Sequence, residues 1–218
     1  GKYLDNYNPS TGKPYSLIPD SGKEDIDLAV EAAKEAFKTW SKTPKQKRSD
    51  ILMKLADSIE KHFDELVKAE SKDNGKPESL AAHVDIPRAP ANIRFFAGAI
   101  LHDSSEMHEM DGTAINYTLR QPVGVAACIS PWNLPLYLLT WKIAPALAAG
   151  NTVVAKPSEV TPMTAYLFSK ICIEAGLPKG VLNIVHGLGS RIGDPLTTHP
   201  DTPIVSFTGG TVTGKHIA

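Results

Sequence analysis

Residues 123–129, Val-Gly-Val-Ala-Ala-Cys-Ile, and residues 152–155, Thr-Val-Val-Ala, are the two apolar runs that decide the fold of this 218-residue chain. Each is followed by a segment of helical character, around 136–148 and 162–175 respectively. Neither run alternates between apolar and polar residues, which is typical of strands buried on both faces of a parallel sheet. The sequence therefore predicts an α/β fold, a Rossmann-like doubly wound sheet with helices on both faces.

The same alternation continues toward the C-terminus. Residues 181–185 are expected to form a strand before a short helix near 191–198, and residues 204–207 a strand before a helix that starts after Gly210. This last helix reaches the end of the chain after only about two turns, at roughly 3.6 residues per turn. A domain that ends within a helix is typical of a fragment of a longer protein, so we expect a truncated chain.

Helices dominate residues 21–101. Ser21 is a candidate N-cap for a first helix that ends near Lys42. Thr43 and Pro44 are a candidate cap and first-turn pair for a second helix. Its apolar side chains recur at steps of three or four residues as far as the stop signal at Asn74-Gly75. A third helix is expected over 86–101.

Short strands flank this helical region. Two are expected within residues 3–20, around the turn Asn8–Gly12. Two more are expected within 113–129, joined at Gln121-Pro122. At Asp111-Gly112 the sequence changes from helical segments to short strands, so we place a boundary between two parts of the chain there.

Composition excludes several classes of protein. A formal net charge of −1 gives no electrostatic reason to expect nucleic acid or an anionic membrane as partner. The seven histidines lack metal-ligand spacing, and two cysteines provide no disulfide framework. No apolar run approaches the roughly 20 residues that span a bilayer. We expect a cytoplasmic protein without a bound metal, with the mitochondrion as the alternative location.

Polar clusters directly follow the expected strands, where ligands bind in doubly wound sheets. Lys156 and Glu159 provide a donor and an acceptor at a spacing that suits a ribose diol; alternatively they are solvated loop charges, with Ser158 capping the next helix. The turn at Gly209-Gly210 exposes backbone N–H groups suited to phosphate; the alternative is a simple tight turn.

Asn133 follows Pro131 and Trp132 in a proline-bounded turn. A side-chain amide on a stiff turn is a suitable oxyanion donor, because donors fixed in advance contribute most to catalysis. The alternative is an ordinary turn residue. Cys128 lies in an apolar strand and Cys172 in an apolar helix, so we expect both thiols in the core rather than as nucleophiles.

A phosphate-binding P-loop is a competing interpretation of residues 209–215. The spacing Gly-x-x-x-x-Gly-Lys is present, but His216 stands where that motif needs a hydroxyl for magnesium. The glycines of 187–193 do not have the Gly-x-Gly-x-x-Gly spacing of the standard dinucleotide fingerprint.

Six motifs together resemble the aldehyde dehydrogenase superfamily in order and spacing, over essentially the whole chain. They are Pro122-Val123-Gly124-Val125, Ser130-Pro131-Trp132-Asn133, Ala149-Gly150-Asn151-Thr152, Lys156-Pro157-Ser158-Glu159, Gly180-Val181-Leu182-Asn183 and Phe207-Thr208-Gly209.

The resemblance implies NAD as cofactor and a role for each matched residue. Lys156 and Glu159 would hold the adenosine ribose, with Glu159 disfavouring the 2′-phosphate of NADP. Gly189 and Thr213 would flank the adenine. Residues that would line the cleft or approach the pyrophosphate are Ile129, Ser130, Pro131, Trp132, Phe207, Gly209 and Gly210. Many members carry Ser where this chain has Gly210. Asn133 would be the oxyanion donor.

The resemblance also implies a division of the chain. Residues 1–112 would be the helical part of the NAD-binding domain, 113–122 an arm that bridges subunits of a homodimer or homotetramer, and 123–218 an incomplete NAD-binding core. The catalytic Cys and general-base Glu of the family have no counterpart here, so we expect these 218 residues to bind the cofactor but to be inactive alone. A non-catalytic NAD-binding or structural protein is the alternative.

The substrate implied by the resemblance is an aldehyde, oxidised to a carboxylic acid. Arg88 would lie at the mouth of the aldehyde tunnel, with Leu134, Leu138 and Trp141 along its wall. An arginine there would pair with a carboxylate, which suits a semialdehyde acid; the alternative is a surface arginine. The patterns around Arg88 and over 134–142 are similar to the 2-aminomuconic semialdehyde dehydrogenase branch.

Overall fold

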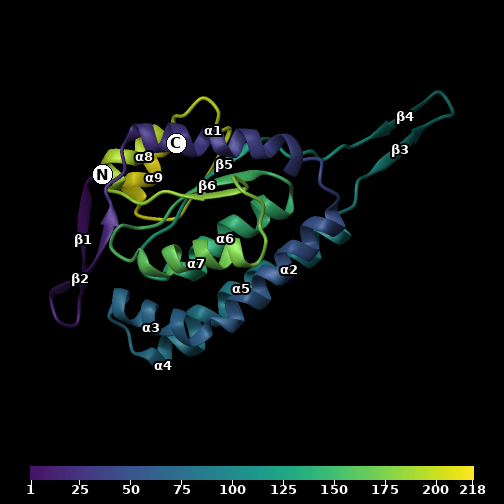
Figure 1. Cartoon of the computed structure of the whole chain (residues 1–218). Coiled ribbons are helices and arrows are strands. Elements are labelled where there is room, and N and C mark those ends of the chain that lie inside the picture. The colour runs from purple at the N-terminus through teal and green to yellow at the C-terminus, as the bar shows by residue number, and fades with distance from the viewer.

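A four-stranded parallel sheet forms the centre of the molecule, described here over residues 1–218 from a computed structural model (Figure 1). The strands are β5 (Val125–Ile129), β6 (Thr152–Lys156), β7 (Leu182–Ile184) and β8 (Ile204–Phe207). Their order is β7-β6-β5-β8, with every neighbouring pair parallel. The chain therefore moves outward from β5 to β7 and then returns to the other side of β5. This reversal confirms the predicted doubly wound sheet and creates a crevice at the carboxyl ends of β5 and β8.

Helices cover both faces of the sheet. One face carries α1 (Lys23–Trp40) and α8 (Gly189–Thr197), and the other carries α6 (Pro135–Ala148) and α7 (Met163–Glu174). Alternate residues of β5 enter separate cores: Ala126 and Cys128 pack with α6 and α7, whereas Val125 and Ala127 pack with α1 and α8. Burial on both faces explains why β5 shows no polar alternation.

A second helical layer lies outside α6 and α7. It contains α2 (Lys45–Lys61), α3 (Phe63–Asn74), α4 (Glu78–Leu80), a π-helix η1 (Ala81–Asp85), α5 (Ile86–Ala99) and a 3-10 turn η2 (Ile100–His102). The prediction of one helix from Pro44 to Asn74, capped by Thr43, is wrong, because the helix breaks at His62 and Pro44 is itself the N-cap of α2. A one-residue break leaves the three-or-four spacing of apolar residues intact, so periodicity does not reveal it. The His62 ring bridges Glu65 at 3.1 Å and Glu174 of α7 at 2.9 Å.

The start of α1 also differs from the prediction. Gly22 rather than Ser21 is the N-cap, and the Asp25 carboxylate accepts the Gly22 N–H at 2.8 Å. The helix ends at Trp40, two residues before the predicted Lys42. Asp25, at the third position of the helix, thus satisfies the main-chain N–H of the N-cap, which is one half of a capping box.

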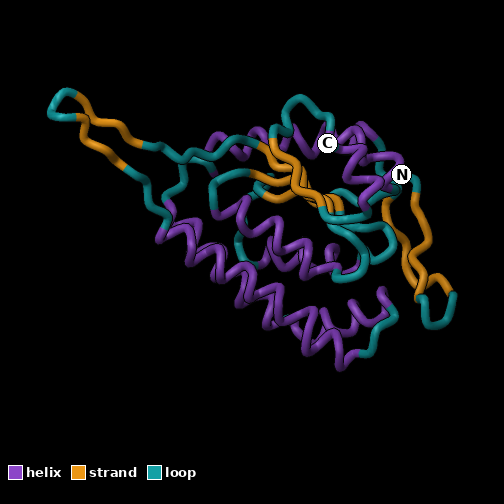
Figure 2. The backbone as a smooth tube through the Cα atoms, turned by 180° about the vertical axis from the view of Figure 1, so that it is seen from behind, coloured by secondary structure: helices purple, strands orange, loops and turns teal.

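Two hairpins extend from the body. β1 (Tyr3–Asn8) pairs with β2 (Lys13–Pro19), as predicted. β3 (Met107–Met110) pairs with β4 (Ala114–Tyr117) in an arm that projects away from every other element (Figure 2).

The position of the arm corrects the sequence prediction. Asp111 and Gly112 have φ values of 46° and 71° and form the tip of the hairpin. Positive φ at both central residues is typical of a type I′ hairpin turn. The expected boundary at residue 112 thus falls inside the arm, and the strands predicted to join at Gln121-Pro122 are β4 and β5, with a longer connection between them.

The remaining helix, α9 (Thr211–Ile217), follows β8 and lies beside α8 at the end of the chain. None of the helices combines the length and the apolar character needed to traverse a bilayer.

Candidate functional site

A cavity of about 640 Å³ opens at the carboxyl ends of β5, β6 and β8. Its walls come from the ends of these strands and the turns after them, and from one side of α8 and of α9. All the residues predicted to contact a cofactor line it: Ile129, Ser130, Pro131, Trp132, Lys156, Glu159, Gly189, Phe207, Gly209, Gly210 and Thr213. The fold thus brings together residues that are spread over more than a third of the sequence.

An ion pair lies on the wall formed by β6. Lys156 Nζ is 2.6 Å from Glu159 Oε2, and Lys156 is only 4% exposed. Burial acts to raise the pKa of Glu159, but the hydrogen bond and charge of Lys156 outweigh it and hold that pKa below its usual value. Glu159 Oε1 also accepts the backbone N–H of Gly189 at 3.4 Å.

These contacts decide between the two interpretations of the pair. A lysine this buried is not a solvated loop charge. Ser158 accepts the Val160 N–H at 3.2 Å, whereas α7 begins only at Met163 with Pro162 as its N-cap, so Ser158 does not cap that helix. Lys156 and Glu159 therefore form an ordered ion pair in the wall of the cavity.

His186, which the sequence analysis did not single out, stands next to this wall. Burial, with the charge of Lys156, lowers its pKa to about 4, so the ring is neutral at pH 7. Its Nδ1 is buried and has no hydrogen-bond partner within the chain. Nothing in the residue pattern distinguished this histidine from the other six.

The packing around the turn after β8 explains why glycine stands at position 209. A Cβ atom at Gly209 would lie 2.4 Å from Cζ of Phe207, so the ring and the backbone are packed too closely for any side chain. Gly210 is the N-cap of α9 and has open space around it. The backbone of this turn therefore forms part of the cavity wall directly, with no side chain in between.

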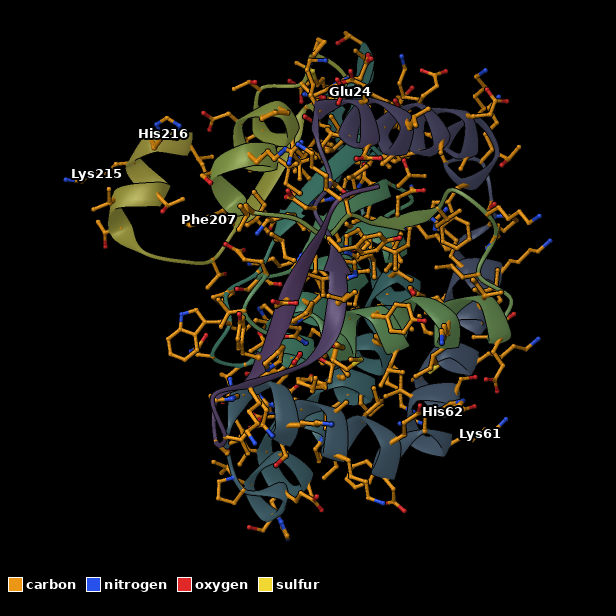
Figure 3. All side chains as sticks on the ribbon, turned by 60° about the vertical axis from the view of Figure 1, so that its left-hand side comes forward. Glu24, Lys61, His62, Phe207, Lys215 and His216 are labelled. Atoms are coloured by element: carbon orange, nitrogen blue, oxygen red, sulfur yellow. The ribbon has the colours of Figure 1, made fainter.

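The geometry does not support the P-loop interpretation. In a P-loop the lysine reaches the bound phosphates. Here Lys215 is absent from the cavity lining and points away from the body, while His216 lies on the inner side of α9 (Figure 3). His216 Nε2 is 2.8 Å from Asp194 Oδ1 of α8, so it links two walls of the cavity.

Lys142 on α6 is a second polar residue that the sequence analysis missed. It is 8% exposed, and its ammonium group donates to Thr208 Oγ1 at 2.5 Å, directly after β8. Burial lowers its pKa. A single lysine inside the apolar run 134–148 was the signal that could have revealed it.

Asn133 lies in the turn between β5 and α6, just beyond the cavity residues Pro131 and Trp132. Its main-chain oxygen accepts a hydrogen bond from Lys76 Nζ at 2.9 Å. Asn74 Nδ2 donates to the Trp132 oxygen at 2.8 Å. The side-chain amide of Asn133 is exposed and takes part in no hydrogen bond within the chain, so it is free to meet a ligand.

The predicted substrate residues lie on α5 and α6 rather than in the cavity. Arg88 donates to the Tyr137 hydroxyl at 3.2 Å and lies 5.1 Å from the centre of that ring. Trp141 packs edge-on against Phe96 at 5.6 Å. Leu138 and Trp141 share one face of α6, since residues three apart lie on the same side of a helix. Leu134 is the N-cap that precedes this helix.

Neither cysteine is arranged as a nucleophile. Cys128 and Cys172 are both buried, and burial raises the pKa of Cys128 to about 12 and that of Cys172 further still. Both therefore remain neutral thiols in the core, as predicted. No group of three or more His, Cys, Asp or Glu side chains converges in a way that suits a metal ion.

Comparison with known proteins agrees with this geometry. The family model described as aldehyde dehydrogenase family matches residues 1–218. The 2-aminomuconic semialdehyde dehydrogenase of Bos taurus is 56% identical over 99% of this chain and 44% of its own length. The 2-hydroxymuconic semialdehyde dehydrogenase of Pseudomonas sp. (strain CF600) is 48% identical over 100% of this chain and 46% of its own.

Solved structures lead to the same conclusion. The structure of an aldehyde dehydrogenase from Bacillus cereus in complex with NAD⁺ superposes with a TM-score of 0.97, at 41% identity, covering 100% of this chain and 45% of that one. The fold is that of an α/β protein with a doubly wound parallel sheet. The chain belongs to the aldehyde dehydrogenase family, which confirms the resemblance seen in its motifs. It spans less than half the length of these relatives.

Proposed function

We propose that residues 1–218 form the cofactor-binding part of an NAD-dependent dehydrogenase that oxidises an aldehyde to a carboxylic acid. The buried Lys156–Glu159 pair carries this proposal, because it presents a cation and a carboxylate at 2.6 Å on the wall of a cavity at the sheet edge. A ribose diol offers both donors and acceptors, so it would satisfy both charges. NAD, when bound, would accept the hydride.

Three further observations support the proposal that these residues hold a dinucleotide. The buried Ser130 hydroxyl has no partner within the chain, although it lines the cavity. Gly210 in the turn after β8 has open space around it, which leaves room for a phosphate to approach the main chain. Glu159 keeps its negative charge because Lys156 lowers its pKa, and a fixed carboxylate at the ribose repels a 2′-phosphate.

Asn133 would act on the aldehyde oxygen. Negative charge develops on that oxygen when a nucleophile adds to the carbonyl carbon, and a preorganised amide N–H stabilises it. The two cysteines of this chain are buried neutral thiols, so we expect both the nucleophile and the general base to lie outside these residues. Loss of such a donor typically costs about 10²–10³ in kcat.

We propose an aldehyde that also carries a carboxylate as the substrate. Arg88 is exposed on α5 and has no acidic partner in this chain, whereas Arg94 on the same helix pairs with Asp57 and Glu60. An unpaired guanidinium near the aldehyde path suits an acidic substrate. The relatives named as semialdehyde dehydrogenases support the same class.

The substrate proposal is tested in a full-length protein that carries this segment. We expect Arg88→Ala to raise KM for an acidic semialdehyde by about 10- to 100-fold, because a charge-assisted hydrogen bond contributes about 1.5–3 kcal/mol. KM for a neutral aldehyde of similar size should change little, and Arg94→Ala serves as the control on α5. Equal effects of Arg88→Ala on both substrates would refute the proposal.

We further propose that the β3–β4 arm joins subunits of a homodimer or homotetramer. Met107, Met110, Ile115 and Tyr117 are all more than half exposed on the arm, and a two-stranded hairpin alone is only marginally stable in water. The cytoplasm is the compartment we propose, because both cysteines are free thiols.

A further inference from the structure

The ammonium group of Lys76, largely shielded from solvent, holds the turn that carries Asn133. Lys76 Nζ donates to the Asn133 main-chain oxygen at 2.9 Å and to Asp85 Oδ2 at 2.6 Å. The side chains of Lys76 and Asp85 are 11% and 1% exposed, so the pair is shielded from solvent. Shielded charge-assisted hydrogen bonds are shorter and stronger than exposed ones. The position of the ammonium group is therefore set by Asp85, and it transmits that position to the turn.

The end of α3 explains how Lys76 reaches this place. Gly75 ends the helix in the left-handed conformation, with φ of 80°, and a Cβ there would lie 2.8 Å from Cγ of Pro9. The residues on either side of this reversal both bond the turn: Asn74 donates to the Trp132 oxygen at 2.8 Å, and Lys76 to the next oxygen along. Ser71 Oγ fixes the main chain of Lys76 at 2.6 Å.

Asp85 owes its inward direction to the π-helix η1, of which it is the last residue. A single π-turn adds one residue to a helical turn and is common at functional sites. Asp85 is buried here, while Arg88, one turn further along α5, is exposed. One segment thus provides both the anchor of Lys76 and the arginine proposed to bind the substrate.

We propose that Lys76, held by Asp85, is a positioning residue for the aldehyde reaction. It fixes the main chain at Asn133 so that the free side-chain amide meets the aldehyde oxygen at the right place. This inference rests on the proposed role of Asn133 as oxyanion donor. A misplacement of about 1 Å at a reacting centre can cost about 100-fold in rate, so such an anchor affects turnover.

The test is a double-mutant cycle in the full-length protein, with kcat, KM and the Kd of NAD measured for each variant. We expect Lys76→Met to lower kcat by about 10- to 100-fold and to leave the Kd of NAD unchanged within about twofold, because Lys156 and Glu159 do not contact it. In an Asn133→Ala background, the same change should cost less than about threefold, because the amide to be positioned is gone. Lys76→Arg should restore part of the loss, since a guanidinium keeps the charge and both donors.

Lys68→Met is the matched control, because Lys68 is exposed on α3 and forms no ion pair; it should behave as the parent does. If Lys76→Met fails to fold, Lys76→Met with Asp85→Asn removes both charges and enters the same cycle. An equal loss of kcat with and without Asn133 would overturn the inference, as would no loss at all. If Asn133→Ala alone leaves kcat unchanged, the role of Asn133 itself fails, and this inference with it.

Discussion

Glu70 is a buried carboxyl group whose ionisation should control how stability depends on pH. It lies on α3 and is 0% exposed, with the Thr164 hydroxyl beside its carboxyl group. Burial raises its pKa from 4.5 to about 7; the charges that face it are Asp73, Asp85 and Lys76. In the unfolded chain the group is solvated and titrates near its ordinary value.

The sign of the pH dependence of stability follows from the number of protons bound in the folded and unfolded states. Between pH 4.5 and about 7 the folded protein holds a proton on Glu70 that the unfolded chain has released. Stability contributed by this group is therefore present at low pH and falls by about 1.4 kcal/mol per pH unit across that window. Over the whole window the loss is about 3 kcal/mol. Glu70→Gln cannot ionise, so it should remove this loss.

Urea unfolding at intervals between pH 5 and 8 measures the effect. The free energy of unfolding of Glu70→Gln, minus that of the parent, should rise by about 2.5 kcal/mol across the series, whatever its value at pH 5. Other titrating groups cancel in the difference. Glu109→Gln, an exposed carboxylate on β3 without an ion pair, should show no such slope. Parallel curves for the parent and Glu70→Gln would refute the reasoning.

Three more predictions concern the cavity, the thiols and the arm. Gly209→Ala should weaken NAD binding by about tenfold or more, because relieving the contact with Phe207 costs about 1–3 kcal/mol; isothermal titration with Gly98→Ala as control measures it, and an unchanged Kd would contradict the close packing. Cys128→Ala should leave kcat of the full-length protein within about threefold of the parent, since the thiol is buried and neutral; loss of turnover in a folded variant would make it a nucleophile after all. Replacing residues 105–119 by two glycines should reduce the oligomer to a smaller species in light scattering, and an unaltered mass would remove the arm from the interface.

The central sheet could be predicted from the sequence because its signal is local. The runs at 123–129 and 152–155 consist almost entirely of apolar residues and glycine without polar alternation, which is typical of strands buried on both faces. Ligands of such sheets bind at the carboxyl ends of the strands, so the residues after each run were natural candidates. The structure brings those candidates into one cavity.

What the sequence did not reveal depends on contacts between distant segments. The break at His62 is held by Glu174, and the anchor of Asn133 comes from Lys76. Neither the sequence separation nor the residue types indicate that these residues are in contact. Asp111-Gly112 was interpreted as a boundary because a two-residue turn and a change of domain share the same residues. His186 stood out only once its burial beside Lys156 was known.

Isothermal titration of NAD into the full-length protein tests the central claim most directly, with NADP and magnesium-ATP titrated in parallel. We expect one NAD site per chain, binding NAD at least about tenfold tighter than NADP because the Glu159 carboxylate disfavours a 2′-phosphate. Glu159→Ala should weaken NAD binding and reduce that preference. No heat of binding with NAD, or tighter binding of magnesium-ATP, would contradict the account.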